Sequence, residues 1–149
     1  MNELYDLIII GAGPAGLSAA IYAGRAKLKT LVLESSAEGG QIVNTAEIAN
    51  YPGQIAGESG QELINRMLKQ ALDFGVSITH DGVSSVKLDC DPKLVICGEK
   101  EYHARSIIIA CGAHHAMIGC PGEEKLAGTG VSYCATCDGP FFEGLPVYV

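Results

Sequence analysis

The feature that most constrains the fold is a glycine-rich run, Gly11-Ala-Gly-Pro-Ala-Gly16, between two segments of different character. Before it, Leu7–Ile10 is wholly apolar, as in a strand buried on both faces of a parallel sheet. After it, Leu17–Ala23 is rich in small side chains, which predicts a helix lying close against that sheet. A second apolar run, Thr30–Glu34, ends in a carboxylate. The sequence therefore predicts a complete βαβ unit.

A G-x-G-x-x-G run alone is a weak signal, but here it follows a predicted strand and opens a predicted helix, and Glu34 lies 18 residues after the last glycine. That context is typical of a dinucleotide-binding site. Gly11 would allow the tight turn, Gly13 the approach of a pyrophosphate, and Gly16 the contact of helix and strand. The helix N-terminus would attract the phosphates. Since a carboxylate at Glu34 favours ribose hydroxyls over a ribose phosphate, FAD or NAD is expected rather than NADP; the alternative is a glycine-rich turn with an incidental glutamate.

The middle of the chain alternates between loop and regular structure. Residues 35–60 are turn-rich, and a long loop of this kind is usually functional. Ser59-Gly-Gln-Glu62 matches a capping box, and the apolar residues from Leu63 to Leu72 keep the helical period. This predicts an amphipathic helix that ends at Gly75, followed by a strand at Val76–Thr79.

The remaining strand signals predict an antiparallel addition to the parallel sheet. Short alternating segments at 83–88, 94–97 and 101–103 are separated by turns, which indicates a small β-meander inserted as a crossover. Ile107–Ala110 returns to the buried parallel type, and Leu145–Val149 is expected to begin a further strand. The predicted fold is α/β, with a central parallel sheet and a small antiparallel meander.

A C-x-x-C pair, Cys134-Ala-Thr-Cys137, lies far downstream of the glycine run and is followed by Asp138. Two cysteines at this spacing can close and reopen a small disulfide by thiolate exchange. Asp138 could supply or accept the proton that such an exchange needs. A zinc site and a purely structural pair are the alternatives. Redox chemistry is favoured, because neither Cys120 nor His114-His115 has the spacing of a standard zinc motif.

Composition excludes other classes of function. A formal net charge of -7 argues against a nucleic-acid partner, and no apolar run approaches the length of a membrane span, so no membrane association is expected. The first residues lead straight into a strand without a visible signal peptide, which predicts a cytoplasmic protein. The adjacent His114 and His115 are expected to be solvated. The cysteines outside the pair are expected to be buried structural residues: Cys90, Cys97, Cys111 and Cys120.

On these residues the chain resembles the bacterial low-molecular-weight thioredoxin reductase family. The matching blocks are Ile10–Gly16, Gly39–Gln41, Glu47–Gly53, Pro121–Glu124 and Gly130–Phe142, of which the last is highly specific. The resemblance implies a three-layer ββα, Rossmann-like FAD-binding domain, interrupted in sequence by an NADPH domain that carries the dithiol. Residues 1–115 would be the N-terminal portion of the FAD domain, and residues 116–149 a linker and the start of the NADPH/dithiol domain.

The resemblance also implies roles for individual residues. The FAD pyrophosphate would lie on the glycine run and the adenosine ribose at Glu34, with Cys137 facing the flavin and Cys134 exchanging with thioredoxin. Asp138 would be the acid, and no metal ligand is expected. Members of the family pass electrons from NADPH through FAD to the dithiol and then to thioredoxin, usually as homodimers. The expected cofactor-binding residues are Gly11, Ala12, Gly13, Pro14, Ala15, Gly16, Glu34, Ser35, Gly39, Gly40, Gln41, Asn50, Val83, Ala110 and Gly112.

The chain departs from the family pattern in two respects. Ala110-Cys-Gly112 replaces the usual Ala-Thr-Gly, with little functional loss expected. At 149 residues the chain supplies about one domain, and no second glycine loop for NADPH is visible. We therefore expect the front half of such an enzyme, with weak or partial FAD binding, no NADPH turnover and exposed apolar surface. The alternatives are a non-catalytic nucleotide-binding module and a related flavin reductase with another disulfide acceptor.

Overall fold

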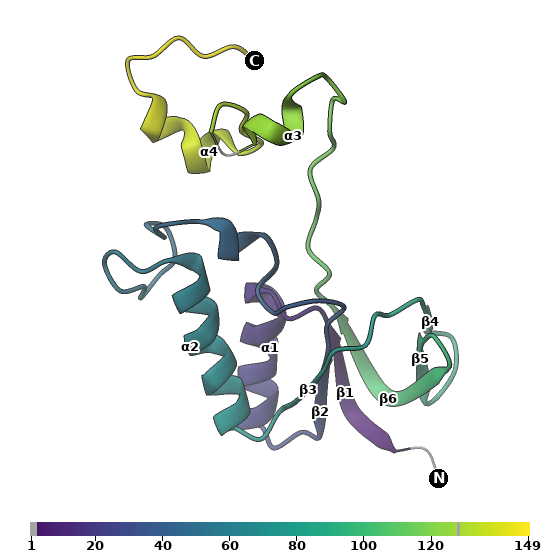
Figure 1. The fold of residues 1–149 in the computed structure, drawn as a ribbon. Helices are drawn as coiled ribbons and strands as arrows, with labels where there is room; N and C mark the ends of the chain where they lie inside the picture. Colours follow the sequence, from purple (N-terminus) through teal and green to yellow (C-terminus); the bar gives the residue numbers. More distant parts are fainter. Residues whose placement is uncertain (1–2, 128) are drawn as a thin grey trace. The chain divides into compact units, whose positions relative to one another are not determined.

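The computed structural model describes residues 3–127 and 129–149, with the side chain of Phe141 left aside. These residues form two compact units, Met1–Gly112 and Ala113–Val149, which we call the N-terminal unit and the C-terminal unit (Figure 1). No helix among the described residues has both the length and the apolar composition that crossing a bilayer requires.

The described part of the N-terminal unit contains a six-stranded sheet with the order β3-β2-β1-β6-β5-β4. Strands β1, β2, β3 and β6 pair in parallel, whereas β4, β5 and β6 pair antiparallel. The mixed sheet confirms the predicted combination of a parallel sheet and a meander. The strands are β1 (Leu4–Ile10), β2 (Thr30–Leu33), β3 (Ser77–Thr79), β4 (Ser85–Lys87), β5 (Lys93–Cys97) and β6 (Lys100–Ile109).

Strands β1 and β2 lie in the middle of three layers. Helices α1 (Pro14–Arg25) and α2 (Gly60–Asp73) cover one face, where Ile9 and Val32 join a common apolar core with them. On the other face, Ile8 and Leu31 form a second core with Val95 and other residues of β5 and β6. Figure 1 shows the two helices on one side of β1 and β2, and β4 and β5 on the other side. Burial on both faces explains why β1 and β2 are almost wholly apolar.

One long strand replaces two that the sequence predicts. The segments 101–103 and 107–110 are predicted as separate strands, but 101–103 and 107–109 both lie within β6, which pairs with β5 and β1 at once. Exposed Arg105 and Ser106 interrupt the apolar pattern in the middle of the strand. The expected burial is also wrong at Ile108 and Ile109, which are 38% and 61% exposed, because the described residues leave this end of β6 uncovered.

Helix α2 begins and ends as the sequence predicts. The Ser59 hydroxyl accepts the Glu62 N–H, and the Glu62 carboxylate accepts the Ser59 N–H at 2.9 Å, so the capping box is complete. At the other end, Gly75 has a φ of +82°, and its N–H donates to the Leu72 carbonyl at 2.8 Å. Between β2 and α2, the turn-rich segment forms a short 3-10 helix, η1 (Gly40–Asn44).

The C-terminal unit consists of short helical turns: α3 (Glu123–Leu126), α4 (Ala135–Asp138) and the 3-10 helix η2 (Gly139–Phe142). The strand expected at Leu145–Val149 is wrong, because these residues are exposed and pair with no other strand among the described residues. Their apolar sequence favours a strand, but a strand also needs a hydrogen-bonded neighbour, and none of the described residues provides one.

Candidate functional site

The glycine run makes a tight connection from β1 to α1, and two of its glycines are required by the chain's own packing. Gly11 has a φ of +106°, and a Cβ there would lie 2.4 Å from the Ala110 carbonyl oxygen. A Cβ on Gly16 would lie 1.9 Å from the Gly11 carbonyl oxygen. These positions let the backbone of the turn lie directly against α1 and the end of β6.

Gly13 differs from its neighbours, because the fold itself does not require a glycine there. Its backbone has an ordinary φ of -76°, and the nearest heavy atom to an added Cβ, the Gly39 carbonyl oxygen, would be 3.6 Å away. That distance is an ordinary van der Waals contact. Within the described residues, a side chain at Gly13 would therefore meet no close obstacle.

The first turn of α1 carries unpaired backbone donors. The helix starts at Pro14, which has no N–H, and no side chain caps it. The first N–H that reaches a carbonyl is that of Leu17, which donates to Gly13 at 2.9 Å. Within the described residues, the N–H groups of Gly13, Ala15 and Gly16 have no acceptor. Unpaired N–H groups at the positive end of a helix dipole form an anion-binding arrangement.

Glu34, directly after β2, ties the end of that strand to the glycine run. Its carboxylate accepts the N–H groups of Ala12 at 2.8 Å, Ser35 at 2.7 Å and Ser36 at 3.2 Å. Partial burial alone would raise the pKa of Glu34, but the hydrogen bonds from Ala12 and the two serines outweigh it and hold the pKa below its usual value. The site therefore carries a fixed negative charge beside the turn at neutral pH.

Other predicted residues reach the turn to different degrees. The Gly39 N–H donates to the Ala12 carbonyl at 3.0 Å, and the Ala110 N–H to the Ile10 carbonyl at 2.8 Å. Val83 directly follows Gly82, where an added Cβ would lie 3.6 Å from the Ser35 Cβ, so this part of the chain passes close to Ser35. Among the described residues, no recorded contact brings Asn50, Gly40 or Gly112 to the glycine run.

Sequence reasoning missed an ion pair that holds the loop around Asn50. The buried Glu58 carboxylate accepts two hydrogen bonds from Arg66 of α2, at 2.5 and 2.7 Å. The Arg66 guanidinium holds the pKa of Glu58 below its usual value. The Ile48 N–H donates to the Glu58 carbonyl at 2.8 Å, which joins the two ends of the loop. The Glu58–Arg66 ion pair then ties these joined ends to α2. An acid in a loop eight residues before an arginine gives no signal in sequence.

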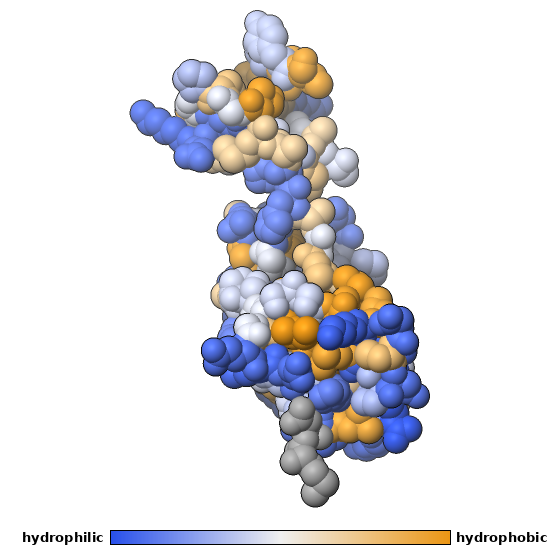
Figure 2. Space-filling view, turned by 90° about the vertical axis from the view of Figure 1, so that its right-hand side faces the viewer, coloured by the Kyte–Doolittle hydropathy of each residue, from blue (hydrophilic) through white to orange (hydrophobic). Residues whose placement is uncertain are grey.

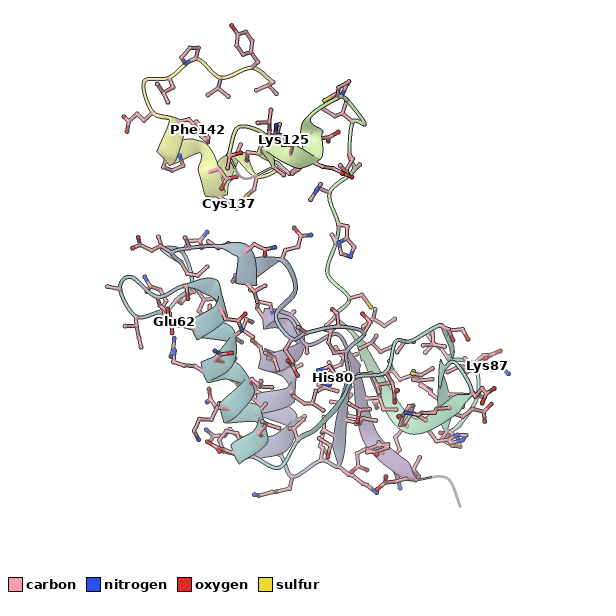
Figure 3. The ribbon with its side chains drawn as sticks, viewed as in Figure 1. Glu62, His80, Lys87, Lys125, Cys137 and Phe142 are labelled. Atoms are coloured by element: carbon pink, nitrogen blue, oxygen red, sulfur yellow. A yellow bond between two sulfur atoms is a disulfide. The ribbon has the colours of Figure 1, made fainter. Side chains whose placement is uncertain are left out.

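The C-x-x-C pair is closed in the C-terminal unit. Cys134 and Cys137 form a disulfide with their Cα atoms 5.2 Å apart, and Figure 3 labels Cys137 in the short helix α4. The N–H groups of Cys137 and Asp138 both donate to the Cys134 carbonyl, at 3.1 and 3.0 Å. The Ser132 hydroxyl donates to the Asp138 carboxylate at 2.5 Å. One turn of the chain therefore carries both sulfur atoms and the Asp138 carboxyl group.

Glu123, which sequence reasoning also missed, organises the loop before the dithiol. It is 3% exposed and accepts the N–H groups of Ile118 at 2.9 Å and Gly119 at 2.6 Å, as well as the Tyr133 hydroxyl at 2.7 Å. The bond to Glu123 raises the pKa of Tyr133 to about 12. The Tyr133 ring stacks on His115, with ring centroids 3.6 Å apart. Tyr133, the residue before Cys134, is thus held both by its ring and by its hydroxyl group.

The cysteines outside the disulfide do not form a buried set. Cys97 is buried in β5 as expected, but Cys90, Cys111 and Cys120 are exposed, so the expectation of burial is wrong for these three. Each of the three lies outside the helices and strands, where no core surrounds it. Across residues 3–127 and 129–149, no group of three or more His, Cys, Asp or Glu side chains is placed to hold a metal ion.

The chain matches the family model described as pyridine nucleotide-disulphide oxidoreductase over residues 5–149. It is 54% identical over 150 aligned positions to a thioredoxin reductase of Peptoclostridium acidaminophilum, covering 100% of this chain and 47% of that protein. It is 49% identical to a thioredoxin reductase of Peptoclostridium litorale, again over 100% of this chain and 47% of that protein. The chain spans about half the length of the curated relatives it matches.

The fold is also similar to that of solved structures. The crystal structure of thioredoxin reductase from Streptococcus pyogenes MGAS5005 matches with a TM-score of 0.86 and 44% identity, over 95% of this chain and 46% of that one. The predicted resemblance to thioredoxin reductases and the predicted α/β fold are thereby confirmed.

Proposed function

The chain belongs to the pyridine nucleotide-disulphide oxidoreductase family, and we propose that it provides the FAD-binding and dithiol parts of a thioredoxin reductase-like flavoenzyme. The proposal includes NADPH as electron donor, thioredoxin or a similar disulfide protein as acceptor, a homodimeric enzyme and a cytoplasmic location. It is supported by relatives named as thioredoxin reductases, of which this chain spans about half.

The residues of the glycine run fit the pyrophosphate of FAD. The first turn of α1 offers donors without acceptors, and Gly13 keeps the space before them free of a side chain although the fold does not require it. Gly13, Ala15 and Gly16 would bind the pyrophosphate through their N–H groups. Glu34 would accept hydrogen bonds from the adenosine ribose, with Ser35, Gly39, Gly40 and Gln41 along the cofactor.

When bound, FAD would supply two-electron redox chemistry to the dithiol. The chain's own part is to hold the reacting sulfurs and to handle their protons. Reduction of the Cys134–Cys137 disulfide breaks one S–S bond and yields two thiols, with two electrons and two protons taken up. We assign Cys134 as the thiol that exchanges with the acceptor, Cys137 as the thiol that faces the flavin, and Asp138 as the acid in the same turn.

The observation that carries this proposal is the uncapped, donor-rich start of α1 beside a glycine that the fold does not need. The test is a titration of FAD with the purified chain, followed by the anisotropy of flavin fluorescence. ADP should displace the bound FAD, because it presents the same adenosine and pyrophosphate groups. Riboflavin is the matched control ligand, since it has the flavin without those groups, and should bind much more weakly. FAD binding that ADP does not displace would contradict the assignment.

A non-catalytic nucleotide-binding module is the second candidate. It is favoured by the fact that the adenosine and pyrophosphate contacts proposed here all come from the N-terminal unit. The two candidates differ in the visible spectrum of the purified chain. A bound flavin gives a yellow protein, whereas a module that retains only the ADP half is colourless.

A further inference from the structure

One hydroxyl of the C-terminal unit bonds to both ends of the dithiol turn. The Ser132 Oγ–H donates to Asp138 Oδ2 at 2.5 Å, and the same Oγ accepts the Cys134 N–H at 3.1 Å. The hydroxyl hydrogen is directed to Asp138, so the oxygen lone pairs stay available to the Cys134 N–H. Ser132 therefore links the backbone of the first cysteine to the carboxyl group that follows the second.

The bond from Ser132 fixes the direction of the Asp138 side chain. An O–H donor 2.5 Å from a carboxyl oxygen makes a hydrogen bond at the short end of the usual range. Within the described residues, Ser132 is the side-chain partner of that carboxyl group. The backbone of α4 fixes only the N–H of Asp138, on the Cys134 carbonyl. Within the described residues, the Ser132 hydrogen bond is what keeps the carboxyl group folded back toward the start of the turn.

Ser132 is itself held in place by the residue that follows it. The Tyr133 hydroxyl donates a hydrogen bond to the buried Glu123, and the Tyr133 ring stacks on His115. These two contacts fix the backbone between Ser132 and Cys134. The Ser132 side chain is exposed, so it adds little to any apolar core. Its two hydrogen bonds are the contribution that the structure records for it.

We propose that Ser132 is a positioning residue, whose hydroxyl holds the Asp138 carboxyl group in place to protonate a dithiol sulfur. The inference rests on the proposed function, in which Asp138 is the acid. When an external thiolate attacks one sulfur of the disulfide, a new S–S bond forms and the Cys134–Cys137 bond breaks. The electron pair remains on the released cysteine sulfur, which then takes a proton. The proton comes from the Asp138 carboxyl group, which Ser132 holds in the same turn; the carboxylate left behind takes a proton back from water.

The test uses reduction of the disulfide in the 149-residue chain by dithiothreitol. The reagent contributes two thiols, closes its own disulfide and leaves two protein thiols, which alkylation and mass spectrometry count over time. Ser132→Ala and Asp138→Asn should each slow reduction by about a hundredfold, the lower end of the range for general acid–base catalysis. The double variant should be no slower than Asp138→Asn alone, because both changes remove the same interaction.

Two further variants separate positioning from general structural damage. Ser132→Thr keeps the hydroxyl and should reduce at close to the rate of the unchanged chain. Thr129→Val removes another hydroxyl hydrogen bond of the same unit, from Thr129 to the Leu126 carbonyl, and should leave the rate unchanged. Circular dichroism of each variant checks that the fold persists.

The outcomes separate the inference from the proposed function. An unchanged rate in Ser132→Ala, or slowing by Ser132→Ala and Asp138→Asn that multiplies in the double variant, would overturn the positioning role and leave Asp138 as the acid. An unchanged rate in Asp138→Asn would overturn the acid role itself, and the positioning role with it.

Discussion

Single residues of the glycine run have separable roles. Gly11 and Gly16 are needed because a side chain at either would meet the backbone, whereas Gly13 has room for one. The G-x-G-x-x-G pattern alone does not tell which of the three glycines the fold requires. The structure distinguishes Gly11 and Gly16, which the turn requires, from Gly13, where a side chain would fit.

Gly13→Ala should therefore impair binding without impairing folding. Its methyl group makes ordinary contacts with the protein but enters the space proposed for the pyrophosphate. We expect the affinity for ADP to fall about tenfold or more, which corresponds to about 1.4 kcal/mol. Calorimetric titration measures the affinity, and thermal unfolding should be close to that of the unchanged chain.

Gly16→Ala is the matched contrast to Gly13→Ala. Its Cβ would lie 1.9 Å from the Gly11 carbonyl oxygen, so the turn has to shift. We expect a loss of about 2 kcal/mol in the free energy of unfolding. If Gly13→Ala destabilises the chain as much as Gly16→Ala, both glycines are structural and the binding role of Gly13 is wrong.

Glu34 should make the stability of the N-terminal unit depend on pH. The pKa of Glu34 is lower in the folded chain than in the unfolded chain, where it is about 4.3. Its contribution to the free energy of unfolding is therefore fully present above the unfolded pKa and is lost as the pH falls through the lower, folded pKa. Glu34→Gln should cost about 1 kcal/mol at neutral pH, a value reduced for solvent exposure. Urea unfolding of the unchanged chain and of Glu34→Gln, at neutral and at acidic pH, checks this. If the difference in their free energies of unfolding does not shrink in acid, the prediction is wrong.

At the scale of whole elements, the sequence predicts those whose signals are local. The Ser59–Glu62 capping box and Gly75 specify both ends of α2, and the apolar runs of β1 and β2 reflect burial on two faces. Strand β6 is predicted as two pieces because Arg105 and Ser106 break its pattern, although its pairing with β1 continues past them. That pairing joins residues about 100 positions apart, which no local pattern reports.

The same reasoning applies to the candidate site. The glycine run and the C-x-x-C pair are visible because a fixed spacing carries their chemistry. Glu58 and Glu123 are invisible, because a buried carboxylate with its partners looks in sequence like any surface acid. Their partners are Arg66 of α2 for Glu58, and Tyr133 with the Ile118 and Gly119 backbone for Glu123.

The cap of α2 gives a prediction at this scale. Ser59→Ala removes the side-chain acceptor for the Glu62 N–H and should lower the free energy of unfolding by about 1 kcal/mol. Urea unfolding followed by circular dichroism measures the change. Ser77→Ala, at an exposed position of β3, is the control and should change it by less than about 0.5 kcal/mol. Equal effects of the two variants would show that the cap adds nothing.

At the scale of the whole molecule, a large amount of apolar surface is open to solvent. Figure 2 shows apolar side chains gathered on one face of the N-terminal unit, among hydrophilic ones. Ile109 at the end of β6 is 61% exposed, and in the C-terminal unit Ile118 is 84% exposed. Monomeric proteins rarely leave extensive apolar patches uncovered, so this surface favours association.

We therefore expect the chain to self-associate as its concentration rises. Sedimentation velocity over a concentration series measures this, and Ile109→Lys should shift the distribution toward the monomer. Gln70→Lys adds the same charge at an exposed polar position of α2 and serves as the control. A chain that stays monomeric at every concentration would show that the exposed apolar residues do not drive association.

The central claim is that the backbone at the start of α1 binds the pyrophosphate of a nucleotide. The most direct measurement is an amide chemical-shift titration of the isotope-labelled chain with ADP, observed by NMR. The account predicts that the amide signals of Gly13, Ala15 and Gly16 shift most and saturate together. If these signals do not move at an ADP concentration that saturates the other shifts, the nucleotide binds elsewhere and the account is wrong.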